Sequence, residues 1–253
     1  MTQLHYEVFG SGPPLVMLHG WAMHGGVWRD FAWRLGQHYQ VILIDLPGHG
    51  FSDPLSPFDL AHLSQVLLRE IPADAFSLLG WSLGATVALA LAERFPERIQ
   101  RLFILSGNPC FMETADWPGM GAESFAAFSA LLDRGVPQTL SRFLALQVNG
   151  LLQSKGYLQV LRQTLPSRPS ASEETLRAGL RLLQQSDFRD LIQQSSLPMT
   201  FILGDQDQLV PIALAQRLRQ LNQGLSVVVI DHAGHTAFLS HVDLLVDSLL
   251  RAY

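Results

Sequence analysis

The sequence contains very little cysteine: Cys110 is the only one in 253 residues. An internal disulfide is therefore excluded, which fits a reducing compartment. No apolar run approaches the ~20 residues that a membrane-spanning helix needs. The first residues also lack the basic and then apolar pattern of a signal peptide. These absences predict a cytoplasmic protein that does not associate with membranes.

Positive charge is also scarce. Lys and Arg number 17 against 22 Asp and Glu, for a net charge of −5, which argues against non-specific nucleic-acid binding. No cluster of His, Cys and carboxylates has the spacing of metal ligands, and the glycine-rich phosphate-binding motifs are absent. We therefore expect no metal and no cofactor, and we expect a monomer. The 48% of hydrophobic residues is ample for a globular core.

Short apolar runs alternate with helical patterns over the first part of the chain. The predicted strands there are residues 15–18, 41–44, 76–79 and 102–105. Two more strands are predicted later, at residues 199–203 and 225–230, each followed by a helix. Continuous apolar strands that alternate with helices are typical of an α/β fold, with a mostly parallel sheet flanked by helices on both faces.

The alternation stops between residues 110 and 186, where helical patterns dominate. We therefore predict a core made of residues 1–109 and 187–253, interrupted by a helical lid at 110–186. This lid should lie over the carboxyl ends of the strands, where open parallel sheets bind ligands. Within it, Ser170 and Glu173 have the spacing of a capping box and predict the start of a helix.

The pentapeptide Gly80-Trp81-Ser82-Leu83-Gly84 joins an apolar run to a helical pattern. A Gly-x-Ser-x-Gly sequence in this context is typical of a nucleophile elbow, a sharp turn from strand to helix that exposes a serine. A side chain at either glycine should collide with the neighbouring strand or helix because the turn is so tight. Ser82 is therefore the candidate nucleophile.

A serine nucleophile needs a histidine base and an acid that orients it. Two later strands end in loops that contain these residue types, at the sheet edge where Ser82 should also lie. We prefer Asp207 to Asp205 because Gly-x-x-Asp is the usual spacing after this strand. We prefer His235 to His232 because it lies deeper in its loop, after a glycine. Asp205 and His232 are interpreted as loop-capping or solvated residues.

The segment His19-Gly20-Trp21 follows the strand at 15–18. We expect the backbone N–H groups of Trp21 and Leu83 to form the oxyanion hole. The Trp21 side chain is then free either to line the pocket or to join the core. Three other residues of catalytic type are interpreted as structural: His19 as a brace for its loop, and Asp45 and His49 as parts of a turn-rich segment.

The predicted lid contains no acidic residue between Arg134 and Ser172. The basic residues of this stretch are Arg134, Arg142, Lys155, Arg162 and Arg168. They indicate either an ordinary solvated helical face or a docking surface for an acidic partner. Phe143 and Gln147 are four residues apart and share a helix face. That face either offers the pocket an aromatic wall and an amide, or places Phe143 in the core.

Three segments of the chain are more specific than the superfamily motifs: residues 106–111, 116–119 and 142–147. Together with the elbow and His19-Gly20-Trp21, these segments show that the chain resembles the pimeloyl-[acyl-carrier protein] methyl ester esterases of biotin synthesis nearly end to end. Members of that family have the α/β-hydrolase fold. This resemblance implies that the chain hydrolyses a methyl ester at the far end of a pimeloyl group carried on acyl carrier protein.

The resemblance also implies roles for individual residues. Ser82, Asp207 and His235 match the family's catalytic triad. Trp21 and Leu83 match its acyl site, and Phe143 and Gln147 match its lid contacts. Arg142 and Lys155 match basic residues that dock the acidic carrier protein, whereas Gln138 and Gln159 stand where arginine is expected.

Several alternatives remain open on the sequence alone. The same motifs fit a short-chain carboxylesterase, a carbon–carbon bond hydrolase, or a lyase that uses the triad as a proton relay. They also fit a non-catalytic receptor that binds its ligand in the hydrolase pocket.

Overall fold

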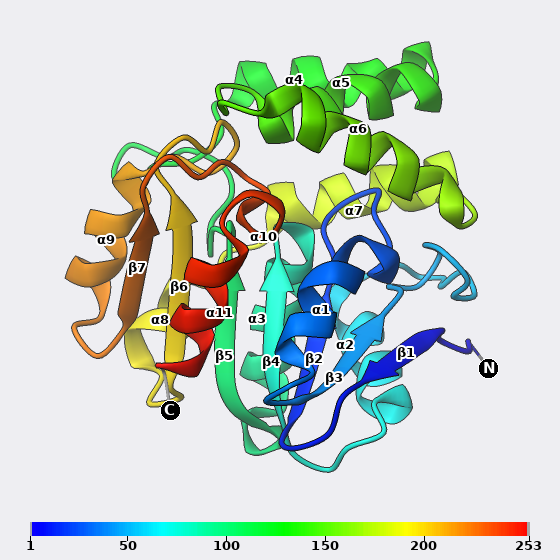
Figure 1. Cartoon of the computed structure of the whole chain (residues 1–253). Helices are drawn as coiled ribbons and strands as arrows, with labels where there is room; N and C mark the ends of the chain where they lie inside the picture. Colours follow the sequence, from blue (N-terminus) through cyan, green and yellow to red (C-terminus); the bar gives the residue numbers. More distant parts are fainter. Residues whose placement is uncertain (1, 252–253) are drawn as a thin grey trace.

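The computed structural model describes residues 2–251. Their strands form a seven-stranded sheet in the order β1-β3-β2-β4-β5-β6-β7 (Figure 1). The strands are β1 (Tyr6–Phe9), β2 (Pro14–Leu18), β3 (Gln40–Ile44), β4 (Phe76–Trp81), β5 (Ile99–Leu105), β6 (Met199–Gly204) and β7 (Ser226–Ile230). All neighbours are parallel except β1, which pairs antiparallel with β3. The predicted mostly parallel sheet is confirmed.

Burial explains why the central strands were visible in the sequence. All six residues of β4 are buried, as are all six of β6, because helices cover both faces of the sheet. Strand β1 has four residues that alternate between exposed and half-buried, with Tyr6 and Val8 facing solvent. It lies at the sheet edge and carries no continuous apolar run, so the sequence did not predict it.

Helices cover the two faces of the sheet (Figure 1). Helices α1 (Arg29–Leu35) and α11 (Val242–Leu250) lie on one face, and α2 (Leu60–Glu70), α3 (Leu83–Arg94) and α8 (Arg189–Gln194) lie on the other. Helix α9 (Ala213–Leu221) packs beside β7, and the short α10 (Ala237–Ser240) precedes α11. Helix α8 was not predicted. Over residues 2–251, no helix is long and apolar enough to cross a membrane.

Four further helices lie above the carboxyl ends of the strands (Figure 1). They are α4 (Ala122–Ser129), α5 (Val136–Val148), α6 (Ser154–Thr164) and α7 (Glu173–Gln185), and we call these helices and the segments that join them the cap. The chain leaves and re-enters the sheet region at one point: Cys110 pairs with Asp187, and the Phe188 N–H donates to the Pro109 carbonyl at 2.8 Å. The division into a 1–109 and 187–253 core and a 110–186 lid stays a prediction, which this pairing supports.

The predicted capping box of α7 is wrong. The helix begins two residues later than that box implies, and Ser172 is its N-cap. The Ser172 hydroxyl accepts the Thr175 N–H at 3.1 Å. Glu173 and Glu174 then occupy the first turn, where their charges favour the positive end of the helix dipole.

Candidate active site

Ser82 occupies a strained turn between β4 and α3. Its φ of 56° and ψ of −117° lie in a region that residues with side chains rarely adopt. A Cβ at Gly80 would lie 2.3 Å from the Gly84 carbonyl oxygen, and one at Gly84 would lie 2.3 Å from the Leu18 carbonyl oxygen. The predicted steric reason for both glycines is confirmed, and the turn places Ser82 at the carboxyl end of the sheet.

Asp207 and His235 form a buried pair in the loops that follow β6 and β7. His235 Nδ1 lies 2.8 Å from Asp207 Oδ2. The other carboxylate oxygen accepts the N–H groups of Leu209 at 2.8 Å and Val210 at 3.0 Å. This arrangement fixes the carboxylate and requires a proton on Nδ1, so Nε2 of a neutral His235 presents a lone pair. The tautomer is the one that a general base for a serine requires.

The His235 loop packs directly on the nucleophile turn. The Trp81 indole N–H donates to the His235 carbonyl at 2.8 Å, and the two rings lie 5.6 Å apart. His235 Nε2 is buried and has no hydrogen-bond partner among the described residues. Over the same residues, neither Asp205 nor His232 hydrogen-bonds to the Asp207–His235 pair. The geometry therefore supports the choice of Asp207 and His235.

Two backbone N–H groups near Ser82 are available to a ligand. Within the described chain, the N–H groups of Trp21 and Leu83 donate to no other residue. Leu83 is the first residue of α3, so its N–H has no partner within the helix. Trp21 precedes Ala22, whose φ of 61° turns the chain sharply. Both groups are therefore free to serve as the oxyanion hole, the role that the sequence predicts for them.

The Trp21 side chain joins the core loop to the cap. Its indole N–H donates to the Leu176 carbonyl of α7 at 2.8 Å. Its ring makes edge contacts with Phe143 at 4.9 Å and with Phe128 at 5.5 Å between centroids. The side chain is buried and also lines the pocket, so the two interpretations of Trp21 are compatible.

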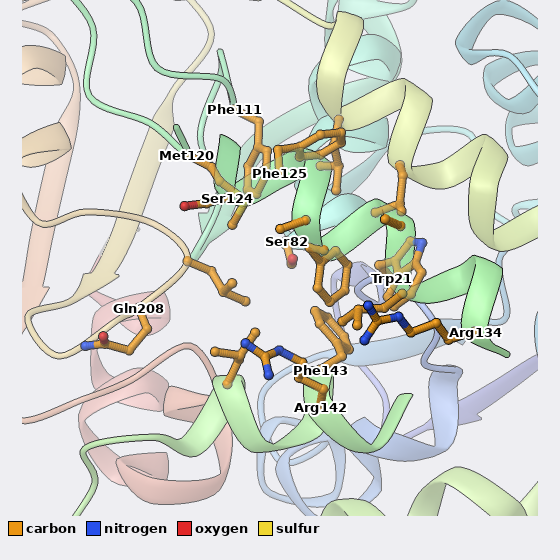
Figure 2. A pocket seen from close by; sticks show the side chains of 18 residues that line it. Trp21, Ser82, Phe111, Met120, Ser124, Phe125, Arg134, Arg142, Phe143 and Gln208 are labelled. Atoms are coloured by element: carbon orange, nitrogen blue, oxygen red, sulfur yellow. The ribbon is translucent and has the colours of Figure 1, made fainter. Parts of the chain in front are cut away.

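A cavity of about 650 Å³ lies between Ser82 and the cap (Figure 2). Most of its wall is apolar, and much of it comes from cap side chains that the sequence did not single out: Phe125, Phe128, Leu180 and Leu183. Apolar residues on an amphipathic helix can face a cavity or a core, and sequence periodicity does not separate the two. Among residues 2–251, no group of three or more His, Cys, Asp or Glu is placed to hold a metal ion.

The cap residues predicted for the site separate into two groups. Phe143 and Arg142 line the cavity. Gln147 is buried outside the cavity wall, and neither atom of its side-chain amide has a partner among the described residues. Lys155 is exposed at the start of α6 and does not line the cavity.

Arg168 differs from the other basic residues of the cap because its side chain is only 3% exposed. Its guanidinium donates to both carboxylate oxygens of Asp45, at 2.7 and 2.8 Å, and to Glu7 at 2.6 Å. It also lies over the Phe51 ring, 5.4 Å from the centroid. Arg168 therefore joins the cap to the core and is not available to an external partner, contrary to the docking interpretation of the whole basic stretch.

Asp45 and the nearby histidines are structural, as predicted. Asp45 also accepts the backbone N–H groups of Gly25 at 2.6 Å and Phe51 at 2.9 Å. His19 accepts the Leu46 N–H at 2.9 Å and thereby braces the loop before Trp21. Burial lowers the pKa of His19 to about 3 and that of His49 to about 4.

We expect the protein to lose stability below about pH 6.5 because of these buried histidines. Each is neutral in the fold but takes up a proton on unfolding, so the free energy of unfolding falls by about 1.4 kcal/mol per pH unit for each. The fall should continue to about pH 4, the folded pKa of His49.

Urea unfolding at pH 7, 6 and 5 measures the slope. H49Q should flatten it, whereas H38Q, at an exposed position, should not; equal slopes in both variants would contradict the prediction.

Comparison with known proteins defines the class of protein to which this chain belongs. The family model described as alpha/beta hydrolase fold matches residues 13–242. Two solved structures show the same arrangement over 99% of this chain and 95% of theirs, each with a TM-score of 0.87. They are the esterase EaEST from Exiguobacterium antarcticum, 23% identical, and a bromoperoxidase from Bacillus anthracis, 20% identical. The chain belongs to the alpha/beta hydrolase fold family.

Within this family, several curated relatives of nearly the same length carry the same description. Proteins described as pimeloyl-[acyl-carrier protein] methyl ester esterase match from Nitrosomonas europaea, at 40% identity over 95% of each chain, and from Xanthomonas axonopodis pv. citri, at 38% over 98% of each. A third, from Aeromonas salmonicida, is 40% identical over 95% of each chain. The resemblance noted in the sequence is confirmed.

Proposed function

We propose that the protein is a serine carboxylesterase that hydrolyses the methyl ester of pimeloyl-acyl-carrier protein, releasing methanol and pimeloyl-acyl-carrier protein. The observation that carries the proposal is the Asp207–His235 pair, joined at 2.8 Å, with the His235 loop packed on the Ser82 turn. The apolar cavity above Ser82 suits an acyl chain. The descriptions of the full-length relatives supply the substrate.

The reaction follows from the roles of five residues. Nε2 of His235 removes the Ser82 proton as Oγ attacks the ester carbonyl, and the Trp21 and Leu83 N–H groups stabilise the oxyanion. The imidazolium, held by Asp207, then protonates the departing methoxide to give methanol. A water molecule, deprotonated by His235, attacks the acyl-enzyme, and the carboxylic acid product leaves with Ser82 restored.

Two exposed cations of the cap are proposed to dock the carrier protein, which is acidic in the family. These are Arg142 on α5 and Lys155 on α6, neither of which makes an ion pair within residues 2–251. Complementary charge on the cap accelerates the encounter and orients the partner. Gln138 and Gln159 leave this surface with less positive charge than the resemblance implies.

The function is tested by comparing kcat/KM for pimeloyl-acyl-carrier-protein methyl ester, dimethyl pimelate and p-nitrophenyl acetate. We expect the carrier-linked ester to be preferred. K155E should lower kcat/KM for that substrate alone, by about fivefold and more strongly at low salt, because charge reversal weakens an exposed, screened attraction. R94E is the matched control, since Arg94 is exposed at the far end of α3.

Two outcomes would count against this function. Equal turnover of free and carrier-linked esters would indicate a general carboxylesterase. Absence of turnover on all three substrates would indicate a binding protein built on a hydrolase fold.

A further inference from the structure

Two arginines form part of the wall of the cavity above Ser82. Arg134 ends the turn that follows α4, and Arg142 lies on α5, which packs against that turn. In the view of Figure 2, both lie across Ser82 from Phe111 and Met120. The two cations therefore lie on one side of the nucleophile, and Phe111 and Met120 lie on the other.

Nothing in the described structure neutralises these two cations. Neither arginine makes an ion pair or a side-chain hydrogen bond among residues 2–251, whereas the buried Arg168 has two carboxylate partners. The residues that line the cavity include both arginines and no Asp or Glu. The wall thus carries two uncompensated positive charges in a protein whose net charge is −5.

The surroundings of the arginines favour binding of an anion. Phe143 and Leu146 line the cavity beside Arg142, and an apolar wall excludes part of the water that screens a charge. A guanidinium presents several N–H donors in a plane, which matches the two oxygens of a carboxylate. A substrate with its ester group at Ser82 and a carboxylate at its other end would offer these donors an anionic acceptor within the same cavity.

We propose that Arg134 and Arg142 form an anion subsite that gives the enzyme a second substrate class, the free half-esters of dicarboxylic acids. The ester carbonyl lies at Ser82, the methylene chain follows the apolar wall, and the terminal carboxylate binds the two guanidinium groups. Water cleaves the ester bond, so a half-ester yields methanol and a dicarboxylate. In a carrier-linked substrate, an uncharged thioester stands in place of this carboxylate, which leaves Arg142 to the carrier protein as proposed above. The inference rests on the proposed esterase function.

The test compares two free methyl esters with the same seven-carbon chain: monomethyl pimelate, which is an anion at pH 7.5, and methyl heptanoate, which is neutral. The measured quantity is the ratio of their kcat/KM values. R134Q and R142Q should each lower this ratio by about tenfold, because each removes a charge-assisted hydrogen bond from the anion alone. R162Q is the matched control, since Arg162 is exposed on α6 and lies outside the cavity wall.

A binding measurement separates recognition of the anion from the chemical step. S82A protein should bind monomethyl pimelate in calorimetry, and R134Q in the same background should weaken that binding by a similar factor. Half-esters of dicarboxylic acids with four to nine carbons should show an optimum length, set by the reach from Ser82 to the arginines.

Several results would overturn the inference. One is an unchanged ratio in R134Q and R142Q, and another is failure of the wild-type enzyme to cleave monomethyl pimelate. A third is a loss in both variants confined to the carrier-linked ester, which would assign the two cations to carrier docking. In all three cases, turnover of the carrier-linked ester would leave the proposed function standing. Loss of turnover on every ester would reject the proposed function itself.

Discussion

Replacing Ser82 with alanine is expected to lower kcat/KM for every ester substrate by about 10⁴- to 10⁶-fold, the range seen when a triad serine is removed. Asp207, His235 and the N–H groups of the oxyanion hole remain in this variant, but no oxygen is left to form the acyl-enzyme. The remaining activity should be only that of a bound ester attacked directly by water.

Ser106 provides the matched control for this experiment. It follows β5, the strand beside β4, and it too has a positive φ, at 44°. It is buried, and its hydroxyl has no hydrogen-bond partner among the described residues. S106A should keep kcat/KM within about threefold, since the residue is not placed in the reaction. Activity of S82A within tenfold of the wild type, at equal thermal stability, would reject Ser82 as the nucleophile.

Replacing Arg168 with methionine is expected to lower the free energy of unfolding by about 3–5 kcal/mol, the usual cost of breaking a buried ion pair from one side. The Asp45 side chain is fully buried, so its charge would lose its main cationic partner in a medium that solvates it poorly. Glu7 is 19% exposed and keeps Arg29 as a partner, so it should contribute less. Urea unfolding at pH 7.5 measures the loss.

A double-variant cycle shows whether the ion pair is the cause. R168M combined with D45N should lose less stability than the sum of the two single variants, because each single change leaves the other charge buried. R162M is the control, since Arg162 is exposed and makes no ion pair within residues 2–251. A loss below 1 kcal/mol in R168M would contradict the assigned role.

The sequence predicted the parts of the fold that depend on local pattern. Central strands such as β4 are buried on both faces and therefore appear as continuous apolar runs. Ser82, Asp207 and His235 follow three parallel strands, so their placement at one edge of the sheet was predictable. The preference for Asp207 over Asp205 rested on spacing, and the hydrogen bond to His235 now supports it.

The parts that were missed depend on contacts between distant residues. Arg168 was grouped with exposed cations because its partners, Glu7 and Asp45, lie 161 and 123 positions away in the sequence. Phe143 and Gln147 do share one side of α5, but only Phe143 reaches the cavity. Helical spacing predicts which residues share one side of a helix. The packing of α5 against its neighbours decides which of those residues is open to a ligand.

The hydrogen bond between Phe188 and Pro109 has a consequence for the evolution and engineering of this protein. Because the chain leaves and returns at one place, the segment between can change in length and sequence without altering the span that the sheet must bridge. A cap taken from a relative is thus exchangeable as a cassette that changes the substrate and keeps the chemistry. The grafted cap must also place an arginine against Asp45, as Arg168 does here, or Asp45 must be replaced by an uncharged residue in the same variant.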